Sequence, residues 1–368
     1  MASQRAVFVA AGGTGGHLFP AEALSNELTA RGVAVELVTD DRALKFGKSF
    51  PARATHAVRA ATPTGGSIVS KGLAVLQLGL GVIEARSLIG KAKPLCVVGF
   101  GGYPTVPPVL AATMLRVPTI LHEQNAVMGR ANRFMAGRVT RIATGFAGLS
   151  GVDAAVRAKS THTGNPVRPS VIEAARLPFP GFADGKLRLL VTGGSQGARV
   201  MSDIVPAAVA GMPQELRARL VVVQQARGED EARVRELYGR YAVDAEVAPF
   251  FSDLPARMAQ AHLVIGRSGA STVSELAVIG RPSILVPFPF ALDQDQAANA
   301  EHLQAVGAAQ VVRQADFTPD WLGKVLEQAL ADREGLTRRA QAAKSAGIPD
   351  AAARLADLVM QTVGGAVA

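Results

Sequence analysis

The chain has 368 residues, which is too long for one ordinary domain and favours two domains of roughly 150–200 residues each. Its 48% hydrophobic residues and 38 glycines fit strands that are buried on both faces and joined by tight turns. The formal net charge of +9 indicates an anionic partner. Because the basic residues are scattered and only 5% of residues are aromatic, we expect a phosphorylated substrate or an anionic membrane surface and no nucleic acid.

The cysteine content and the apolar runs bear on the compartment. Cys96 is the only cysteine and lies in the strand-like run 94–98, so we expect a buried, inert thiol and a reducing compartment. No basic-then-apolar leader precedes the first strand, and no run of about 18 uninterrupted apolar residues occurs. We therefore expect neither a signal peptide nor a membrane-spanning segment.

Apolar strands alternate with helical stretches through the first half of the chain. The pattern predicts strands at 7–11, 33–38, 95–99, 119–122 and 141–144. It predicts helices at 20–31, 72–89, 104–115 and 126–136. This alternation is typical of a mostly parallel, doubly wound α/β sheet, in which ligands lie at the carboxyl ends of the strands.

The alternation stops and then resumes. Residues 145–180 are rich in Gly, Pro and polar turns, and we interpret them as a linker and the start of a second domain. Further strands are predicted at 187–192, 220–224, 243–248, 263–266, 283–286 and 310–312. A charged helical tail follows from about 318, and the apolar spacing of 349–364 predicts packing on a domain. We place the first domain at 1–163 with 349–364, and the second at 164–348.

Two glycine loops of the same design each follow an apolar strand. The first reads GGTGGH at 12–17, and the second reads GGSQGAR at 193–199. A strand that turns into a helix through glycines directs backbone N–H groups and the positive end of the helix to one point, which can hold a phosphate or pyrophosphate. Two such loops predict an anion on each side of a cleft between two similar domains. His17, at the tip of the first loop, is a candidate general base or anion contact.

Three more polar motifs belong to the first half or to the domain junction. Gly101, Gly102 and Tyr103 follow a strand and precede a helix, which predicts a third backbone anion site or a tight turn. The run HEQN at 122–125 ends an apolar strand, which favours recognition of sugar hydroxyls or base catalysis. Arg168 can make a forked contact to a phosphate, or it is an ordinary surface arginine.

The second half has a strand–loop–helix of its own at 266–276. Small residues there allow close approach of a ligand, and the helix start can hold a diphosphate. Glu275, one turn into this helix, is placed to accept both ribose hydroxyls, or it interacts only with the helix dipole. Asp293 and Asp295 match the Asp-x-Asp pattern of metal-dependent glycosyltransferases, but such residues before a helix are also ordinary capping residues. No cluster of His and Cys indicates another metal site.

Taken together and in this order, the motifs at 12–17, 122–125, 193–199 and 267–275 closely resemble the MurG family across nearly the whole chain. These are the UDP-N-acetylglucosamine–N-acetylmuramyl-(pentapeptide) pyrophosphoryl-undecaprenol N-acetylglucosaminyltransferases of bacterial peptidoglycan synthesis. The resemblance implies a GT-B architecture, with two Rossmann-like domains facing a cleft. It implies inverting transfer of N-acetylglucosamine (GlcNAc) from UDP-GlcNAc to the C4 hydroxyl of the lipid-linked pyrophosphoryl-MurNAc-pentapeptide, without cofactor or required metal. It also implies a peripheral location at the cytoplasmic face of the inner membrane.

The resemblance assigns the donor to the second domain and the undecaprenyl-linked acceptor to the first. Glu275 matches the ribose-binding glutamate, and Phe251 matches the position whose backbone pairs with uracil. The residues implied to touch the diphosphate or the donor sugar are Thr14, Gly15, Gly16, Asn125, Arg168, Ser195, Ala270, Ser271, Thr272 and Gln296. The residues implied to hold the acceptor's pyrophosphate are Gly12, Gly13, Gly101, Gly102 and Tyr103. For the base, His17 is the first choice and Glu123 the second.

Two other functions stay open on the sequence alone. A UDP-GlcNAc 2-epimerase shares this fold and this donor but needs no lipid acceptor. A non-catalytic, membrane-recruited nucleotide-sugar-binding subunit would bind the donor without turnover.

The stretch 68–89 is the candidate membrane contact. Helical spacing puts Leu73, Leu76, Leu80 and Ile83 on one face, and Val75, Leu78 and Val82 widen it. Glycines and charges interrupt the stretch, so we expect a helix that is half core and half in the membrane surface. The basic residues placed to meet anionic headgroups are Lys71, Arg138 and Arg141.

Overall fold

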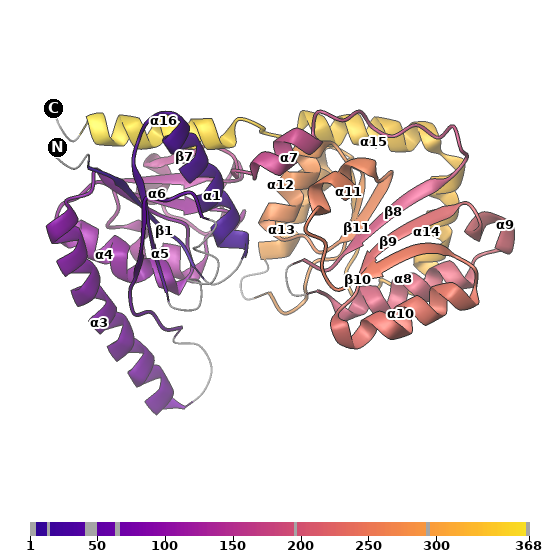
Figure 1. Ribbon diagram of the computed structural model, residues 1–368, viewed down its shortest axis with the longest axis horizontal. Helices are drawn as coiled ribbons and strands as arrows, with labels where there is room; N and C mark the ends of the chain where they lie inside the picture. The colour runs from indigo at the N-terminus through magenta and orange to yellow at the C-terminus, as the bar shows by residue number, and fades with distance from the viewer. Residues whose placement is uncertain are drawn as a thin grey trace. The chain divides into compact units, whose positions relative to one another are not determined.

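The structure is a computed structural model that describes residues 5–12, 15–40, 50–62, 67–194, 197–291 and 295–365. Contacts divide the chain into two compact units. The first unit comprises residues 1–168 and 349–368, and the second comprises 169–348. Each unit is a parallel sheet with helices on both faces (Figure 1). The predicted fold class, two doubly wound α/β domains, is therefore confirmed.

The described residues of the first unit form a sheet of seven parallel strands in the order β3-β2-β1-β4-β5-β6-β7. The strands are β1 (Val7–Ala10), β2 (Val35–Thr39), β3 (Ala54–Ala57), β4 (Cys96–Gly99), β5 (Thr119–Glu123), β6 (Arg141–Thr144) and β7 (Ser160–His162). The two edge strands, β3 and β7, were not predicted. Both are short, partly exposed and rich in Thr and His, so they lack the apolar run that marks the central strands.

Alternation along β1 divides the core of the first unit into two layers. Phe8 faces the cluster formed with α3, α4 and α5, whereas Val7 and Val9 face the cluster formed with α1 and α16. The helices are α1 (Gly15–Ala30), α3 (Ile68–Ala92), α4 (Val106–Met114), α5 (Arg130–Ala136), α6 (Ala154–Ala158) and α16 (Ala351–Gly364), with a 3₁₀ turn η1 (Tyr103–Thr105) before α4. Cys96 is buried in β4, and burial raises the pKa of its thiol to about 12.

Helix α16 returns from the end of the chain to the first unit. Leu355 and Val359 join the same core cluster as Leu24 and Leu28 of α1, and Figure 1 shows α16 beside α1. Helix α1 begins earlier than the sequence predicts, at Gly15, and contains Pro20. Proline favours the first turn of a helix, which is why the pattern alone placed the start there.

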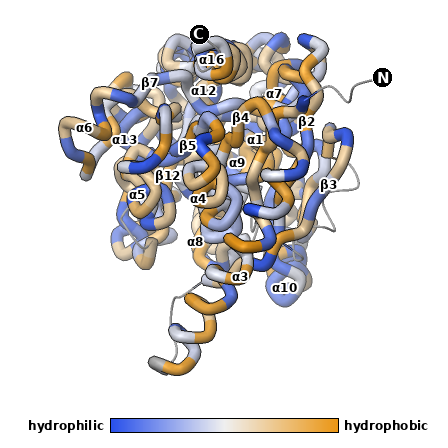
Figure 2. The backbone as a smooth tube through the Cα atoms, turned by 90° about the vertical axis from the view of Figure 1, so that its left-hand side faces the viewer, coloured by the Kyte–Doolittle hydropathy of each residue, from blue (hydrophilic) through white to orange (hydrophobic). Residues whose placement is uncertain are grey.

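Helix α3 is unusually apolar on its exposed side. Ser67 caps its amino end by accepting a hydrogen bond from Ser70 N–H, and its tip extends away from the rest of the unit, with hydrophobic stretches along it (Figure 2). Among the described residues, it is the one helix that is long and apolar enough to cross a membrane, over Val69–Ala92. Of its apolar 18-residue stretch, 22% is buried within the protein. The exposed large side chains are Val69, Leu73, Val75, Leu76 and Ile83. Leu78 and Val82, which the spacing added to this face, instead pack against the core.

In the second unit, the part of the chain that the structure describes forms a sheet of six parallel strands in the order β10-β9-β8-β11-β12-β13. The strands are β8 (Leu187–Thr192), β9 (Leu220–Gln225), β10 (Asp244–Ala248), β11 (Leu263–Gly266), β12 (Ser283–Leu285) and β13 (Ala309–Val311). All six strands agree with the prediction to within about one residue at each end.

Nine helices of the second unit lie in the described part of the chain. They are α7 (Pro169–Ala174), α8 (Arg199–Gly211), α9 (Gln214–Arg217), α10 (Gly228–Arg240), α11 (Leu254–Gln260), α12 (Ala270–Ile279), α13 (Asp295–Ala305), α14 (Pro319–Ala331) and α15 (Arg333–Ser345). The stretch 145–180, predicted as irregular, contains α6, β7 and α7. These elements are only three to six residues long, too short to show a period.

Candidate active site

Three predicted motifs of the first unit meet at one edge of its sheet. Strands β1, β4 and β5 are parallel neighbours, so the loops that follow them lie side by side at their carboxyl ends. These are the glycine loop before α1, the turn at Gly101–Gly102 and the HEQN segment. Thr14 and Gly13 of the first loop lie outside the described residues.

His17 lies against the turn at Gly101 and Gly102. A Cβ built on Gly102 would come 3.4 Å from His17 Cε1, and one on Gly101 would come 3.5 Å from His17 Cδ2. Both glycines have positive φ angles, 79° and 73°, which other residues rarely adopt. Burial lowers the pKa of His17 to about 4. The imidazole is therefore neutral at pH 7 and able to accept a proton.

The glycine before α1 lies close to the proline of η1. Gly15 and Gly16 form the first turn of α1, and a Cβ on Gly12 would come 2.9 Å from Pro104 Cβ. Tyr103, the first residue of η1, is partly buried. The Arg168 guanidinium stacks 4.0 Å from the ring centre of Phe19 on α1, so this arginine belongs to the first unit.

The four HEQN residues have different surroundings. His122 is fully buried in β5, with its ring 5.3 Å from that of Phe100 and its Nε2 3.3 Å from the Gly164 carbonyl oxygen. Burial lowers the pKa of His122 to about 4. Gln124 is buried too, and its Nε2 donates to the Phe100 carbonyl oxygen at 2.7 Å. Of the four, Asn125 is the one that is partly exposed.

Glu123 is 1% exposed, and the carboxylate accepts several N–H groups. Its Oε1 accepts from Asn125 N–H at 3.0 Å, and its Oε2 accepts from Gly129 N–H at 3.0 Å and from Asn132 Nδ2 at 2.8 Å. Burial raises the pKa of Glu123, while these donors oppose that rise. The carboxylate thus holds the turn that carries Asn125.

Asn132 is part of this arrangement, although no sequence motif marks it. It is 2% exposed on α5, and its Nδ2 also donates to the His122 carbonyl oxygen at 3.2 Å. A Cβ on Gly101 would come 3.3 Å from this nitrogen. Asn132 therefore ties α5 to the end of β5, and it lies close to the turn at Gly101. An asparagine within a helix gives no local signal of such a role.

The glycine loop of the second unit is tightly folded, and Ser195 lies outside the described residues. A Cβ on Gly193 would come 2.1 Å from Ala198 N, and Gly194 and Gly197 have φ angles of 79° and 68°. The N–H groups of these three glycines donate within the protein, to Gln225 Oε1, Thr192 Oγ1 and the Gly194 carbonyl oxygen respectively. These three N–H groups are thus already used, which differs from the unpaired donors that the motif predicts.

Helix α12 starts at Ala270, after Gly269, and presents the predicted diphosphate positions. Ser271 and Thr272 are partly buried, and Ser271 Oγ is a buried oxygen without a hydrogen-bond partner among the described residues. Glu275 is 6% exposed on the same helix. A buried hydroxyl with no partner is unusual and fits a group that awaits a ligand.

Gln296 lies next to the start of α12. Its carbonyl oxygen accepts from Ser268 Oγ at 2.7 Å, and its Oε1 accepts from Phe288 N–H at 3.0 Å. Arg267, which the sequence analysis did not assign, holds the same loop by donating to the Val286 and Pro287 carbonyl oxygens. Gln296 and α12 are therefore brought together within the second unit.

Phe251 and the acidic pair complete the predicted set. Phe251 follows β10, is 7% exposed and lies 4.3 Å below the Arg257 guanidinium. Asp293 lies outside the described residues, and Asp295 begins α13. In the described part of the chain, no group of three or more His, Cys, Asp or Glu is arranged to hold a metal ion.

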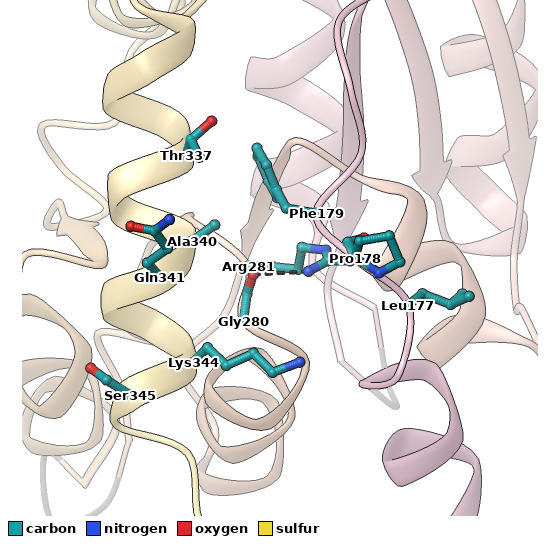
Figure 3. Close-up of a pocket in the computed structure, with 10 residues that line it drawn as sticks. All are labelled: Leu177, Pro178, Phe179, Gly280, Arg281, Thr337, Ala340, Gln341, Lys344 and Ser345. Carbon is teal, nitrogen blue, oxygen red and sulfur yellow. Dashed lines mark hydrogen bonds between the residues drawn. The ribbon is translucent and has the colours of Figure 1, made fainter.

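A pocket of about 450 Å³ lies elsewhere in the second unit (Figure 3). Figure 3 shows α15 side chains on one side, Leu177, Pro178 and Phe179 on the other, and Arg281 between them. Arg281 precedes β12 and therefore lies at the amino edge of the sheet, away from the predicted site. Its guanidinium donates to the carbonyl oxygens of Pro178, Ala259, Ile279 and Gly280, which makes it a structural cross-link.

Family models match both halves of the chain. The glycosyltransferase family 28 N-terminal domain matches residues 7–144, and the C-terminal domain of that family matches residues 188–355. A relative from Methylobacterium sp. (strain 4-46) is named UDP-N-acetylglucosamine–N-acetylmuramyl-(pentapeptide) pyrophosphoryl-undecaprenol N-acetylglucosamine transferase. It is 58% identical over 362 residues, which cover 98% of this chain and 97% of the relative.

Two solved structures extend the comparison. MurG from Acinetobacter baumannii has a TM-score of 0.79 and 27% identity, with 97% of this chain and 99% of that chain covered. A UDP-GlcNAc 2-epimerase from Neisseria meningitidis has a TM-score of 0.67 but only 13% identity, with 97% and 99% covered, so it shares the fold alone. The matches over both halves and the full-length identity confirm the resemblance: this chain belongs to the MurG family of GT-B glycosyltransferases, the N-acetylglucosaminyltransferases of glycosyltransferase family 28.

Proposed function

We propose that this enzyme transfers GlcNAc from UDP-GlcNAc to the C4 hydroxyl of lipid-linked pyrophosphoryl-MurNAc-pentapeptide, with inversion at the anomeric carbon. The observation that carries this proposal is the 58% identity, over 98% of the chain, to a relative that is named for this reaction. The similarity to an epimerase is confined to the fold, at 13% identity. The reaction is a step of peptidoglycan synthesis.

The second unit, residues 169–348 in the structure, is proposed to hold the donor. Glu275 accepts the ribose hydroxyls, the backbone of Phe251 pairs with uracil, and Gln296 binds the GlcNAc hydroxyls. The start of α12 at Ala270, Ser271 and Thr272 receives the diphosphate, together with Ser195. The Ser271 hydroxyl is buried and has no hydrogen-bond partner in the described part of the chain, which supports this assignment because a diphosphate oxygen would accept its hydrogen bond.

The first unit is proposed to hold the acceptor. Its pyrophosphate rests on the two glycine turns, formed by Gly12, Gly13, Gly101, Gly102 and Tyr103. The groups that reach the donor are Thr14, Gly15, Gly16, Asn125 and Arg168. Residues 349–364 belong to this unit in the proposal because α16 packs on α1.

His17 is the proposed general base. The C4 hydroxyl oxygen attacks the anomeric carbon, its proton passes to the His17 imidazole, and the bond from the anomeric carbon to the β-phosphate oxygen breaks with its electrons leaving on UDP. A pKa of about 4 keeps the imidazole neutral before the acceptor binds, and the anionic pyrophosphate beside it would raise that pKa. Glu123 is less suited to this role because four N–H groups, from Asn125, Gly129 and Asn132, already occupy its two oxygens.

The charge that develops on the departing UDP needs a positive environment. The start of α12 supplies backbone N–H groups and the positive end of a helix dipole, and Arg168 supplies a guanidinium. We therefore propose that no divalent cation is required. Excess chelator should leave most of the activity in place. A loss of activity that only Mg²⁺ or Mn²⁺ reverses would indicate that Asp293 and Asp295 are metal ligands.

We propose that α3 lies in the surface of the anionic cytoplasmic leaflet and holds the enzyme there as a peripheral protein. Val75 and Leu76 are 61% and 58% exposed, which is unusual for apolar side chains unless something covers them. Lys71, with Arg138 and Arg141, would add about 1 kcal/mol each near anionic headgroups. Replacing Lys71 by Glu and both Val75 and Leu76 by Ser should weaken binding to anionic vesicles and leave UDP binding intact.

A matched control for α3 comes from the second unit. The triple change Leu177→Ser, Val306→Ser and Lys324→Glu also removes two exposed apolar side chains and one cation. Vesicle binding that falls equally in both triple variants would remove α3 from the membrane contact.

The proposed reaction is tested by following labelled GlcNAc from UDP-GlcNAc to a lipid-pyrophosphoryl-MurNAc-peptide. We expect a disaccharide-lipid product and no change in the donor when the acceptor is left out. Formation of the 2-epimer without acceptor would favour the epimerase function. Donor binding with no product in either case would favour a non-catalytic subunit.

A further inference from the structure

Gln225 joins two loops of the second unit that no motif connects. It is the last residue of β9, it is 7% exposed, and it lies opposite Ala248 in the register with β10. Strand β9 lies between β8 and β10 in the sheet, so the carboxyl ends of those two strands lie on either side of Gln225.

Each end of the Gln225 amide is hydrogen-bonded to a different loop. Oε1 accepts from Thr192 Oγ1 at 3.0 Å and from Gly193 N–H at 3.2 Å, at the end of β8. Nε2 donates to the Pro249 carbonyl oxygen at 3.2 Å, just after β10. One planar amide, with its acceptor on one side and its donor on the other, therefore fixes the distance between the two loops.

The bond to Thr192 extends the effect of Gln225 into the glycine loop. Thr192 Oγ1 donates to Gln225 and in turn accepts from Gly194 N–H at 3.3 Å. The first two N–H groups of the loop are thus oriented by one chain of hydrogen bonds. Gln225 therefore acts on the glycine loop through hydrogen bonds inside the protein.

We propose that Gln225 is a positioning residue that couples the binding of the nucleotide's diphosphate to the binding of its base. This rests on the proposed function, which puts the diphosphate between the start of α12 and Ser195 of the loop after β8, and uracil on the backbone of Phe251, two residues beyond Pro249. With both loops held at a fixed separation, a nucleoside that binds at one already has the other in place, so less conformational freedom is lost when the diphosphate binds.

Two variants separate the halves of this connection. Thr192→Val removes the Thr192 hydroxyl, which bonds to Gln225 Oε1 and Gly194 N–H, and leaves the Gly193–Gln225 and Gln225–Pro249 bonds. The glycine loop is then held less firmly, so UDP should bind about three- to tenfold more weakly while uridine binds as in the wild type. Gln225→Met removes the bonds to both loops, so the binding of UDP should weaken by about tenfold or more and the binding of uridine by about threefold. Titration calorimetry with UDP and with uridine gives the four dissociation constants.

Gln224→Met is the matched control. Gln224 is the preceding residue, is fully buried, and bonds to the Tyr238 hydroxyl and the Met201 carbonyl oxygen, in helices α10 and α8. Its loss should lower the thermal stability and leave both dissociation constants unchanged. Wild-type affinities in Gln225→Met, or equal losses in Gln224→Met, would overturn the coupling alone. Failure of the wild type to bind UDP would overturn the proposed function and the coupling with it.

Discussion

The carboxyl edges of the two sheets use different groups for their predicted sites. The edge of the first unit is built from buried side chains, among them Glu123, Gln124 and Asn132, with the neutral His17 against a glycine turn. The edge of the second unit is built from backbone groups and helix starts, held by the amide of Gln225 and the carbonyl of Gln296. A buried imidazole can move a proton, whereas oriented backbone dipoles hold charge without taking part in proton transfer. We infer that the first unit carries the proton chemistry and the second carries donor binding.

Removing His17 should have the largest effect. His17→Asn keeps a polar side chain but cannot accept a proton, so kcat should fall about 10²- to 10⁴-fold, with little change in the KM for UDP-GlcNAc. Steady-state kinetics at saturating acceptor measure this. His162→Asn, on the exposed part of β7, is the control and should behave as the wild type. A His17→Asn enzyme with nearly full kcat would remove this histidine from the chemistry.

The buried histidines should also make the first unit sensitive to acid. The folded-state pKa of His122 is about 4, below its ordinary 6.5, so the unfolded chain takes up the proton first as the pH falls. His122 should therefore contribute a drop of about 3 kcal/mol in the free energy of unfolding between pH 6.5 and 4, and this contribution should be missing in His122→Asn. His17, whose pKa is also about 4, contributes to both proteins alike. Glu123, whose raised pKa acts with the opposite sign, is common to both proteins. Equal slopes in urea titrations of the two would contradict the account.

Replacing Glu275 tests whether the second unit binds the donor. Glu275→Ala should weaken the binding of the donor by an amount on the order of 1.5–3 kcal/mol, because it removes a charge-assisted contact to the ribose. The KM for UDP-GlcNAc should rise accordingly while kcat at saturating donor changes little. Glu301→Ala, an exposed carboxylate on α13, is the control. Unchanged donor binding in a folded Glu275→Ala protein would take this residue out of the site.

Replacing Glu123 distinguishes the two candidate bases of the first unit, Glu123 and His17. Glu123→Gln places an NH₂ group against the N–H donors of Asn125, Gly129 or Asn132, so we expect a loss of about 1–3 kcal/mol in the free energy of unfolding. The acidic limb of the kcat–pH profile should persist, because His17 still titrates. If that limb disappears in Glu123→Gln and remains in His17→Asn, then Glu123 is the base.

Local sequence patterns predict most of the fold. The predicted bounds of β6, β8 and β11 match the structure because each has an apolar centre next to a glycine or polar turn. The edge strands β3 and β7 were missed because their residues are partly exposed and mostly polar. Edge strands need no continuous apolar run, so their sequences resemble loops.

The candidate site also has parts that the sequence predicts and parts that it does not. The glycine loops could be predicted because the loop and the strand before it are adjacent in sequence. Gln225 bonds to Gly193, which is 32 residues away, and Asn132 bonds to Glu123 across the turn before α5. Such contacts depend on strand order and helix packing, which one sequence does not contain. The residues that hold a site in place are therefore harder to predict than the loops that form it.

The division of labour between the units is tested most directly by the affinity of His17→Asn for UDP-GlcNAc. Titration calorimetry compares its dissociation constant with that of the wild type. If the first unit carries the proton chemistry and the second carries donor binding, the two constants should agree to within about twofold, although the variant is nearly inactive. A loss of affinity of about tenfold or more would contradict that division, because it would mean that His17 contributes to holding the donor.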